Sequence, residues 1–466
     1  MTLGTLMMSA LFLAGCGGGA GSFAPRAANS TTSAEAGHQT TSLADGLSSG
    51  AIRQVCGPPI RGRARCSAYV LTHPSTGLAS GTRSLLKKKT LPEGYGPDDL
   101  QDAYNTASAA KTRGGDSVIA IVDAFDNPRA EQDMSVYRAM YGLPACTTAN
   151  GCFKKVNQAG QSGPLPPAPT GDALPWLVES SLDLDMVSAN CPKCRILLVE
   201  PDNDVMNNMG EGVNTAARLG ATAISNSYVS QESPTDPGPI ANDGLLPYYV
   251  HPGIAVVAAT GDYGYSLNPS APNAFGGPTG ALIPASFPSV VASSGTTLTR
   301  DSSPRGWHEQ ALQQSGSGCS MFEPASPWQK TDPSCVGTYT ERSGRVVSFP
   351  SRVYGDVAYV GDASTGVAVY DTNNDGWFPN LWGVIGGTSA TAPAIAAIYG
   401  LAGYGTGHSD DNPFPGKILY KAKNGLNDVT TGFNGWCTPS ILCTAGPGYD
   451  APTGNGTPNG ISAFQN

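Results

Sequence analysis

Runs of consecutive apolar residues recur along the chain, separated by stretches in which apolar residues have a helical spacing. The run at 118–122, Val-Ile-Ala-Ile-Val, has no polar member, which is typical of a strand buried on both faces of a parallel sheet. Further strands are predicted at 195–199, 221–224, 254–258 and 290–292. Helices are predicted at 128–141, 174–189 and 205–219.

The alternation of strands and helices predicts an α/β fold, with a mostly parallel central sheet and helices on both faces. Such sheets place functional residues beyond the carboxyl ends of their strands. Polar residues that follow a predicted strand, or lie in the next loop, are therefore candidates for a functional site.

The N-terminal region lacks this alternation. Residues 1–16 are almost wholly apolar or small and end in Leu-Ala-Gly-Cys, which predicts a signal peptide. This ending is similar to the lipobox of bacterial lipoproteins, in which a cysteine such as Cys16 is lipidated, although no Lys or Arg precedes it. Plain secretion and a chance apolar start are the alternatives.

Three more regions follow. Residues 17–50 are rich in Gly, Ala, Ser and Thr, which predicts a flexible tether. Residues 51–90 form a short N-terminal segment that ends near three lysines at 87–89, either a solvated loop or a processing site. One large domain is predicted at 91–466.

The composition narrows the class of protein. The 466 residues carry a net charge of −9, only 14% of them are charged, and 40% are hydrophobic. The acidic balance argues against a nucleic-acid partner. Because there are few carboxylates to protonate, the fold should lose less stability on acidification than an ordinary protein. Beyond the N-terminus no apolar run approaches the ~18 residues of a membrane span. The composition as a whole is typical of a secreted or surface-exposed globular protein, which we expect to be a monomer.

The cysteines also indicate export. The chain has eleven cysteines, and ten remain when Cys16 is set apart. This even number falls into pairs of near neighbours in the sequence. In an oxidising compartment five local disulfides are the simplest interpretation, although sequence alone does not fix their connectivity. Cys191 and Cys194 could instead form a redox or zinc site, but no second C-x-x-C and no nearby histidine supports zinc. The near neighbours are Cys56/Cys66, Cys146/Cys152, Cys191/Cys194, Cys319/Cys335 and Cys437/Cys443.

Ser389 is the candidate nucleophile. It lies in Gly-Thr-Ser-Ala-x-x-Pro, directly before an apolar helix predicted at 394–401, whose N-terminus would supply free N–H groups near a reacting oxygen. An ordinary Ser/Thr helix cap is the alternative. The string resembles the serine motif of the subtilisin-like superfamily, whose base is a histidine in His-Gly-Thr. None of the five histidines has that context; they are His38, His73, His251, His308 and His408. Asp123 lies where a subtilisin has its aspartate, and without the histidine we interpret it as structural.

A pair of carboxylates could replace the histidine. Glu179 and Asp183 are four residues apart in the predicted helix 174–189 and share one face of it. A solvated acidic face is the alternative interpretation. In a partly buried site two such groups would share protons, so that one stays ionised and one protonated in acid.

Glu-x-x-Leu-Asp-x-Asp from 179, followed far downstream by Gly-Thr-Ser-Ala, resembles the sedolisin family of serine-carboxyl peptidases over residues 91–466. The resemblance implies a subtilisin-like fold with a Ser-Glu-Asp triad. In it Glu179 would be the general base for Ser389, and Asp183 would orient Glu179. Asp262, in Gly-Asp-Tyr-Gly, matches the family's oxyanion-hole aspartate. A carboxyl group donates a hydrogen bond only when protonated, which implies operation in acid.

The resemblance also implies one structural Ca²⁺ near the C-terminus. Carboxylates and backbone carbonyls in glycine turns suit Ca²⁺, which takes six to eight oxygens. The side-chain ligands would be Asp428 and Asp450, and the carbonyl ligands Val429, Gly446 and Gly448.

The function implied is that of a secreted or surface-anchored serine-carboxyl endopeptidase, which hydrolyses peptide and protein substrates at acidic pH. Membrane contact is expected only through a lipid anchor at Cys16. A catalytically inactive surface lipoprotein or binding module on the same fold is one alternative, and a subtilisin-like enzyme with an unrecognised histidine base is another. Many family members carry a large prosegment, whereas residues 51–90 would be a much reduced one, so control by a full prodomain is not expected.

Overall fold

The computed structural model describes residues 50–72, 91–232, 244–265, 281–329, 331–340, 343–373, 376–378, 381–405, 413–422, 424–438 and 440–465. All of them belong to one compact unit, Thr40–Asn466. The predicted signal peptide, the lipobox Cys16, nearly all of the tether and the lysines at 87–89 lie outside the described residues. The boundaries of the four predicted regions therefore stay predictions.

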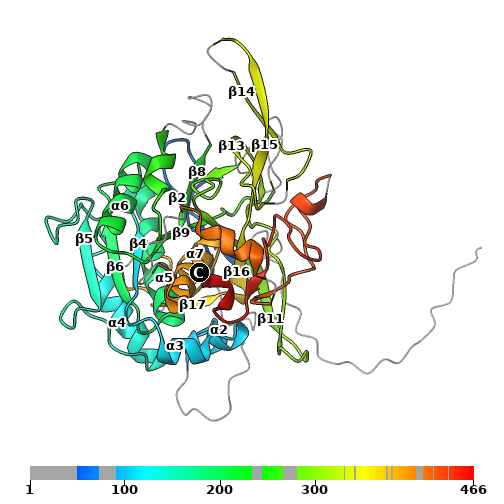
Figure 1. Ribbon diagram of the computed structural model, residues 1–466. Helices are drawn as coiled ribbons and strands as arrows, with labels where there is room; N and C mark the ends of the chain where they lie inside the picture. The colour runs from blue at the N-terminus through cyan, green and yellow to red at the C-terminus, as the bar shows by residue number, and fades with distance from the viewer. Residues whose placement is uncertain are drawn as a thin grey trace, which may run out of the picture. The chain divides into compact units, whose positions relative to one another are not determined.

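An eight-stranded sheet occupies the centre of this unit (Figure 1). The strand order is β12-β11-β9-β7-β4-β6-β5, with β16 pairing β11, and every pair is parallel except β11 with β12. The strands are β4 (Val118–Val122), β5 (Phe153–Asn157), β6 (Arg195–Glu200), β7 (Ala223–Asn226), β9 (Ala255–Ala259), β11 (Val291–Arg300), β12 (Trp307–Ala311) and β16 (Val357–Val360).

Helices cover both faces of the sheet, as the alternation of β4 side chains shows. Ile119 and Ile121 are buried in one core cluster with residues of α5 and α7, whereas Ala120 and Val122 are buried in a second cluster with residues of α6. The predicted fold class is confirmed. The α-helices are α2 (Pro97–Ala103), α3 (Ala107–Thr112), α4 (Ala130–Tyr141), α5 (Pro175–Asn190), α6 (Met206–Arg218) and α7 (Thr388–Ala402).

Smaller sheets surround the centre, with orders β1-β3-β18-β17, β10-β8-β2, β13-β15-β14 and β19-β20. Their strands are β1 (Ile52–Gln54), β2 (Arg65–Cys66), β3 (Tyr69–Leu71), β8 (Tyr228–Gln231), β10 (Leu282–Ile283), β13 (Gly318–Pro324), β14 (Val336–Thr340), β15 (Val346–Tyr354), β17 (Val367–Tyr370), β18 (Trp382–Gly386), β19 (Leu426–Asn427) and β20 (Thr457–Pro458). The 3-10 helices are η2 (Gly171–Ala173), η4 (Leu246–Tyr249), η5 (Ala363–Thr365), η6 (Pro415–Lys421), η7 (Ser440–Leu442) and η8 (Ser462–Phe464).

Two element boundaries differ from the prediction for identifiable reasons. The strand predicted at 290–292 continues to Arg300, because it pairs with β16 and β12 beyond the apolar run. Its polar residues are buried inside the protein, where the Ser293 hydroxyl donates to Thr391 Oγ1 at 2.8 Å. The helix predicted at 394–401 begins at Thr388, so Pro393 lies inside it. A proline lacks the N–H that would bond the carbonyl four residues earlier. That carbonyl, on Ser389, accepts from the Ser227 hydroxyl at 3.2 Å instead.

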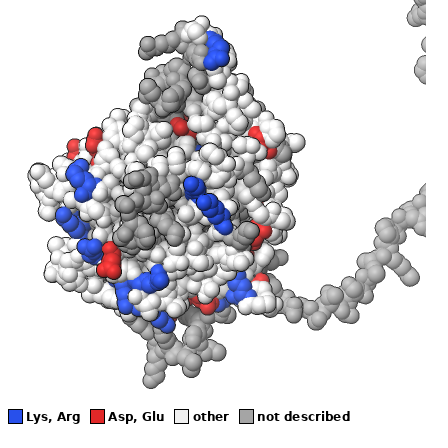
Figure 2. Space-filling model, viewed as in Figure 1, with Lys and Arg blue, Asp and Glu red and all other residues white. Residues whose placement is uncertain are grey.

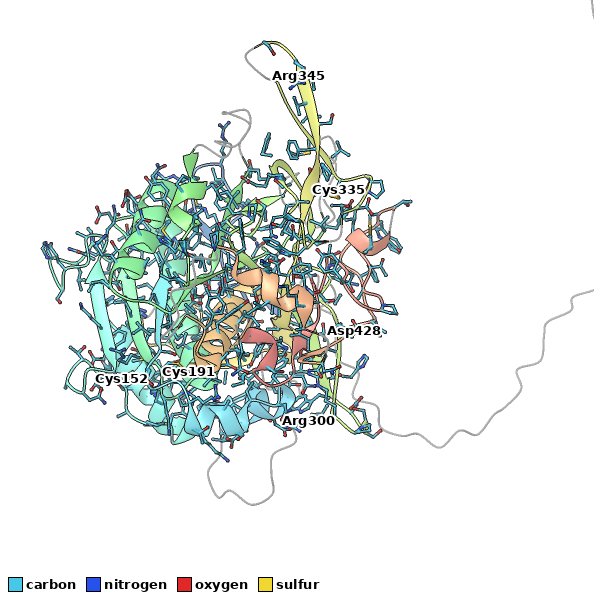
Figure 3. All side chains as sticks on the ribbon, viewed as in Figure 1. Cys152, Cys191, Arg300, Cys335, Arg345 and Asp428 are labelled. Atoms are coloured by element: carbon cyan, nitrogen blue, oxygen red, sulfur yellow. A yellow bond between two sulfur atoms is a disulfide. The ribbon has the colours of Figure 1, made fainter. Side chains whose placement is uncertain are left out.

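Ten cysteines form the five local disulfides that the sequence predicts, with Cα–Cα distances of 4.8–6.0 Å. These separations are those that a disulfide requires. Cys191, labelled in Figure 3, pairs with Cys194, and the two form a clip instead of a zinc half-site.

The surface in view carries basic and acidic side chains in small separate groups among uncharged residues (Figure 2). This dispersion agrees with a charged content of only 14%. Among the helices that the structure describes, none combines the length and the hydropathy that crossing a membrane would require.

Candidate active site

Helix α5 carries Glu179 and Asp183 through the interior of the protein. Every residue from Trp176 to Asn190 is buried, and both carboxyl groups are 0% exposed. A solvated acidic face is therefore wrong as an interpretation of this pair. A helix that is buried all round brings its polar side chains to other parts of the chain instead of to water.

Ser389 lies in the first turn of α7, directly after β18 and the glycine pair at 386–387. Gly387 has a φ of +107°, and a Cβ there would lie 2.1 Å from the Ser67 carbonyl oxygen, so a residue with a side chain does not fit. Because Ser389 lies in the first turn of the helix, its N–H has no helical partner. It donates to the Ser67 carbonyl oxygen at 2.9 Å.

Asp262 follows β9 and faces the start of α7. Its Oδ1 accepts from the backbone N–H of Thr388 at 2.8 Å and from the Thr388 hydroxyl at 2.9 Å. Its Oδ2 is buried without a hydrogen-bond partner among the described residues. Burial raises the pKa of Asp262 to about 7, although the two bonds from Thr388 act in the opposite direction.

Glu179 and Asp183 have pKa values raised well above the ordinary range, first of all by burial. For Glu179 the charges of Asp123 and Asp262 raise the pKa further, and the nearby Ser389 hydroxyl lowers it. Neither oxygen of Glu179 is aligned in a hydrogen bond with a described residue, because the Ser389 hydroxyl donates to the Ser227 carbonyl at 3.1 Å. Catalytic hydrogen bonds are often formed fully only when a substrate reacts.

Ser227, between β7 and β8, links the carboxyl pair to the serine and was missed by the sequence analysis. Its Oγ lies 2.7 Å from Asp183 Oδ2 and 3.2 Å from the Ser389 carbonyl oxygen. A hydroxyl has one proton to donate, so both contacts become hydrogen bonds at once only if Asp183 is protonated and donates to Ser227. The raised pKa of Asp183 favours that state.

Asp123 joins the same cluster from the end of β4. Burial raises its pKa to about 8, and neither of its oxygens has a hydrogen-bond partner among the described residues. Its charge raises the pKa of both Glu179 and Asp183. The interpretation of Asp123 as merely structural therefore overlooked its contribution to the electrostatics of the site, which its place at a strand's carboxyl end could have indicated.

Two of the five histidines lie in the described residues, and neither is placed to act as a base for Ser389. The His251 ring lies 3.0 Å from the Tyr248 carbonyl oxygen. His308 is exposed on β12. Among the described residues, the side chains near Ser389 that could act as its base are carboxyl groups.

Comparison with known proteins finds relatives that extend over most of the chain. Kumamolisin from Bacillus sp. (strain MN-32) is 28% identical over 398 residues, which cover 83% of this chain and 66% of that protein. Sedolisin from Pseudomonas sp. (strain 101) is 24% identical over 418 residues, with 83% of this chain and 63% of that protein covered. Over most of its length the chain is similar to sedolisins.

The fold of the chain is that of a solved protein. The structure of Pseudomonas sedolisin, a serine-carboxyl proteinase complexed with two molecules of pseudo-iodotyrostatin, matches with a TM-score of 0.60 and 20% identity, covering 80% of this chain and 98% of the other. No protein-family model matches the chain. The chain spans less than two thirds of the full length of the curated sedolisin-family relatives named above.

The region where the sedolisin resemblance implies calcium lies between β19 and β20, and Asp428 is labelled in Figure 3. Gly446 N–H donates to Asp450 Oδ2, and Gly448 N–H donates to Asp428 Oδ2, each at 2.9 Å. Burial raises the pKa of Asp450 to about 7, and the charge of Asp428 adds a smaller increase.

No group of three or more His, Cys, Asp or Glu residues that could hold a metal occurs in the described residues. A cation at Asp428 and Asp450 would need backbone oxygens in addition, as the predicted carbonyl ligands Val429, Gly446 and Gly448 would supply. Oxygen donors of these two kinds fit Ca²⁺. The carboxyl pair fits the ion, and the complete ligand set stays a prediction.

Proposed function

We propose that the chain is a serine-carboxyl endopeptidase that hydrolyses peptide bonds in peptide or protein substrates at acidic pH, outside the cell or at its surface. The observation that carries this proposal is the convergence of a helix-terminal serine with buried carboxyl groups. Five disulfides support an oxidising compartment. The solved structure that matches the fold is that of a serine-carboxyl proteinase, which supports the reaction class.

The proposed reaction requires Glu179 to be ionised, so it proceeds in those molecules whose carboxyl cluster has released a proton although burial raises the pKa of Glu179. The Ser389 hydroxyl then attacks the carbonyl carbon of the substrate and Glu179 accepts its proton. Asp183, hydrogen-bonded to Ser227, orients Glu179. The N–H of Ser389 and a protonated Asp262 donate to the oxyanion. Glu179 then returns the proton to the leaving amine, and water hydrolyses the acyl-enzyme by the same steps.

The acid requirement follows from Asp262. Both a carbonyl oxygen and a carboxylate oxygen are acceptors, so Asp262 Oδ2 can stabilise an oxyanion only while it carries a proton. Its pKa of about 7 keeps it protonated in acid. Above that pH an ionised Asp262 would repel the developing negative charge, and the reaction should stop.

Peptide cleavage measured from pH 3 to 8 tests the proposal. The parent should show a bell-shaped profile with an optimum roughly between pH 3 and 5.5. Ser389→Ala should have no activity at any pH. Asp262→Asn keeps a donor that does not titrate, so it should lose rate at the optimum and have a flatter alkaline limb. A neutral optimum would favour a histidine base, and complete inactivity of the parent, even freed of its N-terminal segment, would favour a binding module.

We also propose one structural Ca²⁺ held by Asp428 and Asp450. A ligand that binds only the native state stabilises it by about 2.7 kcal/mol at a concentration of 100 Kd. A chelator should therefore lower the Tm of the Ser389→Ala protein, and added Ca²⁺ should restore it. Asp450→Ala should abolish this response, whereas Asp172→Ala, which removes an exposed carboxylate from η2, should retain it. A Tm that ignores the chelator would contradict the site.

A further inference from the structure

The side chain of Asn127, in the loop after β4, is buried against the turn of α5 that carries Glu179. We propose that Asn127 is a positioning residue for this general base. It fixes the rotation of α5, and thereby the distance between the Glu179 carboxyl group and the Ser389 hydroxyl. The inference rests on the proposed peptidase function and deepens it, because it gives a part in the reaction to a residue that does not touch the substrate.

Asn127 is 3% exposed, and its amide group approaches α5 closely. Nδ2 lies 2.7 Å from Ser180 Oγ, 3.2 Å from the Leu177 carbonyl oxygen and 3.3 Å from Ser181 Oγ. Both serine hydroxyls donate to that same carbonyl oxygen, at 3.0 and 3.2 Å. These bonds join the turn into one unit, and Asn127 connects this unit to the end of β4.

The contacts lie on the side of α5 that faces away from Glu179. Successive residues of an α-helix are about 100° apart around its axis, so Glu179 lies roughly 200° from Leu177. Ser180 and Ser181 lie within about 60° of Leu177. Asn127 therefore holds the back of the helix, and Glu179 extends from the front.

The position of Glu179 depends on this support, because hydrogen bonds of its own do not fix the side chain. Neither of its oxygens is aligned in a hydrogen bond with a described residue. A rotation of α5 by about 10° would move a carboxyl group that lies roughly 6 Å from the helix axis by about 1 Å. A misplacement of about 1 Å can lower a rate about 10²-fold. Loss of the Asn127 contact should therefore reduce catalysis without removing any reacting group.

Asn127 is itself held at its other polar groups. Its N–H donates to Glu200 Oε1 at 2.9 Å, and its carbonyl oxygen accepts from Lys155 Nζ at 2.8 Å. Its Oδ1 accepts the Arg129 N–H at 2.9 Å. Glu200 ends β6 and Lys155 lies in β5, the two strands that follow β4 in the order of the sheet (Figure 1). The central sheet therefore sets the orientation of the amide group.

The backbone that precedes Asn127 is strained. Phe125 has a φ of +70°, in a region that a residue of this size rarely adopts. Its N–H donates to the Pro201 carbonyl oxygen at 2.9 Å, and the next N–H, of Asp126, donates to the Pro167 carbonyl oxygen at 3.3 Å. Strained residues persist only where the surrounding structure enforces them, and they cluster at functional sites. The strain supports a role for this loop in the reaction.

A second amide on the same helix allows a positioning role to be separated from a stabilising one. Gln101, which is 8% exposed, donates from Nε2 to the Ala189 carbonyl oxygen at 2.7 Å. At a rise of about 1.5 Å per residue, Ala189 is roughly 15 Å from Glu179 along α5. Removal of either amide should lower the Tm, but only removal of the Asn127 amide should displace Glu179.

Steady-state cleavage of a peptide by the full chain at its optimum pH tests the inference, with the Tm of each variant measured alongside. Asn127→Ala should lower kcat about 10²-fold and leave KM within about twofold of the parent value, because no group that binds substrate is lost. Gln101→Ala should keep the parental kcat. A parental kcat in Asn127→Ala, or an equal fall in both variants, would overturn the inference and leave the proposed function standing. A parent that cleaves no peptide would overturn both.

Ser180→Ala is a milder change, for the case in which Asn127→Ala does not fold. It removes the acceptor nearest to Asn127 Nδ2 and leaves the Leu177 carbonyl oxygen. Its kcat should fall by a smaller factor, about threefold to tenfold, at unchanged KM. In the double variant the fall should be no greater than in Asn127→Ala alone, because the two substitutions remove one contact. If the two effects multiply, or if Ser180→Ala has a parental kcat, Asn127 does not act through this turn of α5.

Discussion

Glu179→Gln is expected to lower kcat by roughly 10²–10⁴-fold, the usual effect of losing a general base. Glutamine has the same shape and the same buried position in α5, but it cannot accept the proton of Ser389. The change should fall on kcat more than on KM, because Glu179 acts in the transition state and not in substrate binding. Steady-state cleavage of a peptide at the optimum pH measures both.

The matched control is Glu211→Gln, which removes an exposed carboxylate from α6. Its turnover should equal that of the parent. If Glu179→Gln turned over at a near-parental rate, Glu179 would have no place in the mechanism, and the base would have to be sought among the other carboxyl groups.

The free energy of unfolding is expected to fall as the pH rises from about 4 to 8. Burial raises the pKa of Asp262 to about 7 and that of Asp123 to about 8. In the unfolded chain these groups ionise near pH 4. Between the two values the native state holds protons that the unfolded chain has released. The stability is therefore complete at low pH and is lost as the pH approaches the native pKa, by roughly 1.4 kcal/mol per pH unit and group.

The Tm of the Ser389→Ala protein between pH 4 and 8, at a fixed Ca²⁺ concentration, measures this slope without self-cleavage. Asp123→Asn removes one titrating group, so its Tm should vary less with pH. A Tm that rose steadily towards pH 8 would show that these carboxyl groups are ionised in the native state.

The sequence predicts the central sheet well, because parallel strands buried on both faces consist of unbroken apolar runs such as that of β4. It predicts less of β11, where buried Ser and Thr residues interrupt the apolar pattern and bond to other elements, as Ser293 does to Thr391. The pair Glu179 and Asp183 is evident from its helical spacing. Whether such a pair is exposed depends on what packs around the helix, and the pattern of one helix does not contain that information.

Contacts between distant parts of the chain account for what the sequence analysis missed. Ser227 is 44 residues from Asp183 and 162 from Ser389 in the sequence. Contacts over such separations produce no repeating pattern of residues from which they could be predicted. Arg65 and Cys66 form a strand only because β8 offers an edge to pair with. The sequence around Ser67 therefore gave no sign that its N–H would lie beside Ser389 Oγ.

The burial of α5 has a consequence for how the protein would lose activity on heating. The helix that carries Glu179 and Asp183 packs against α7, which carries Ser389, and both are buried along their length. Neither helix can detach while the rest of the fold persists, since each forms part of the main hydrophobic core. Thermal inactivation and global denaturation should therefore be one event. The lifetime of the active protein on heating would then be set by the rate of global unfolding.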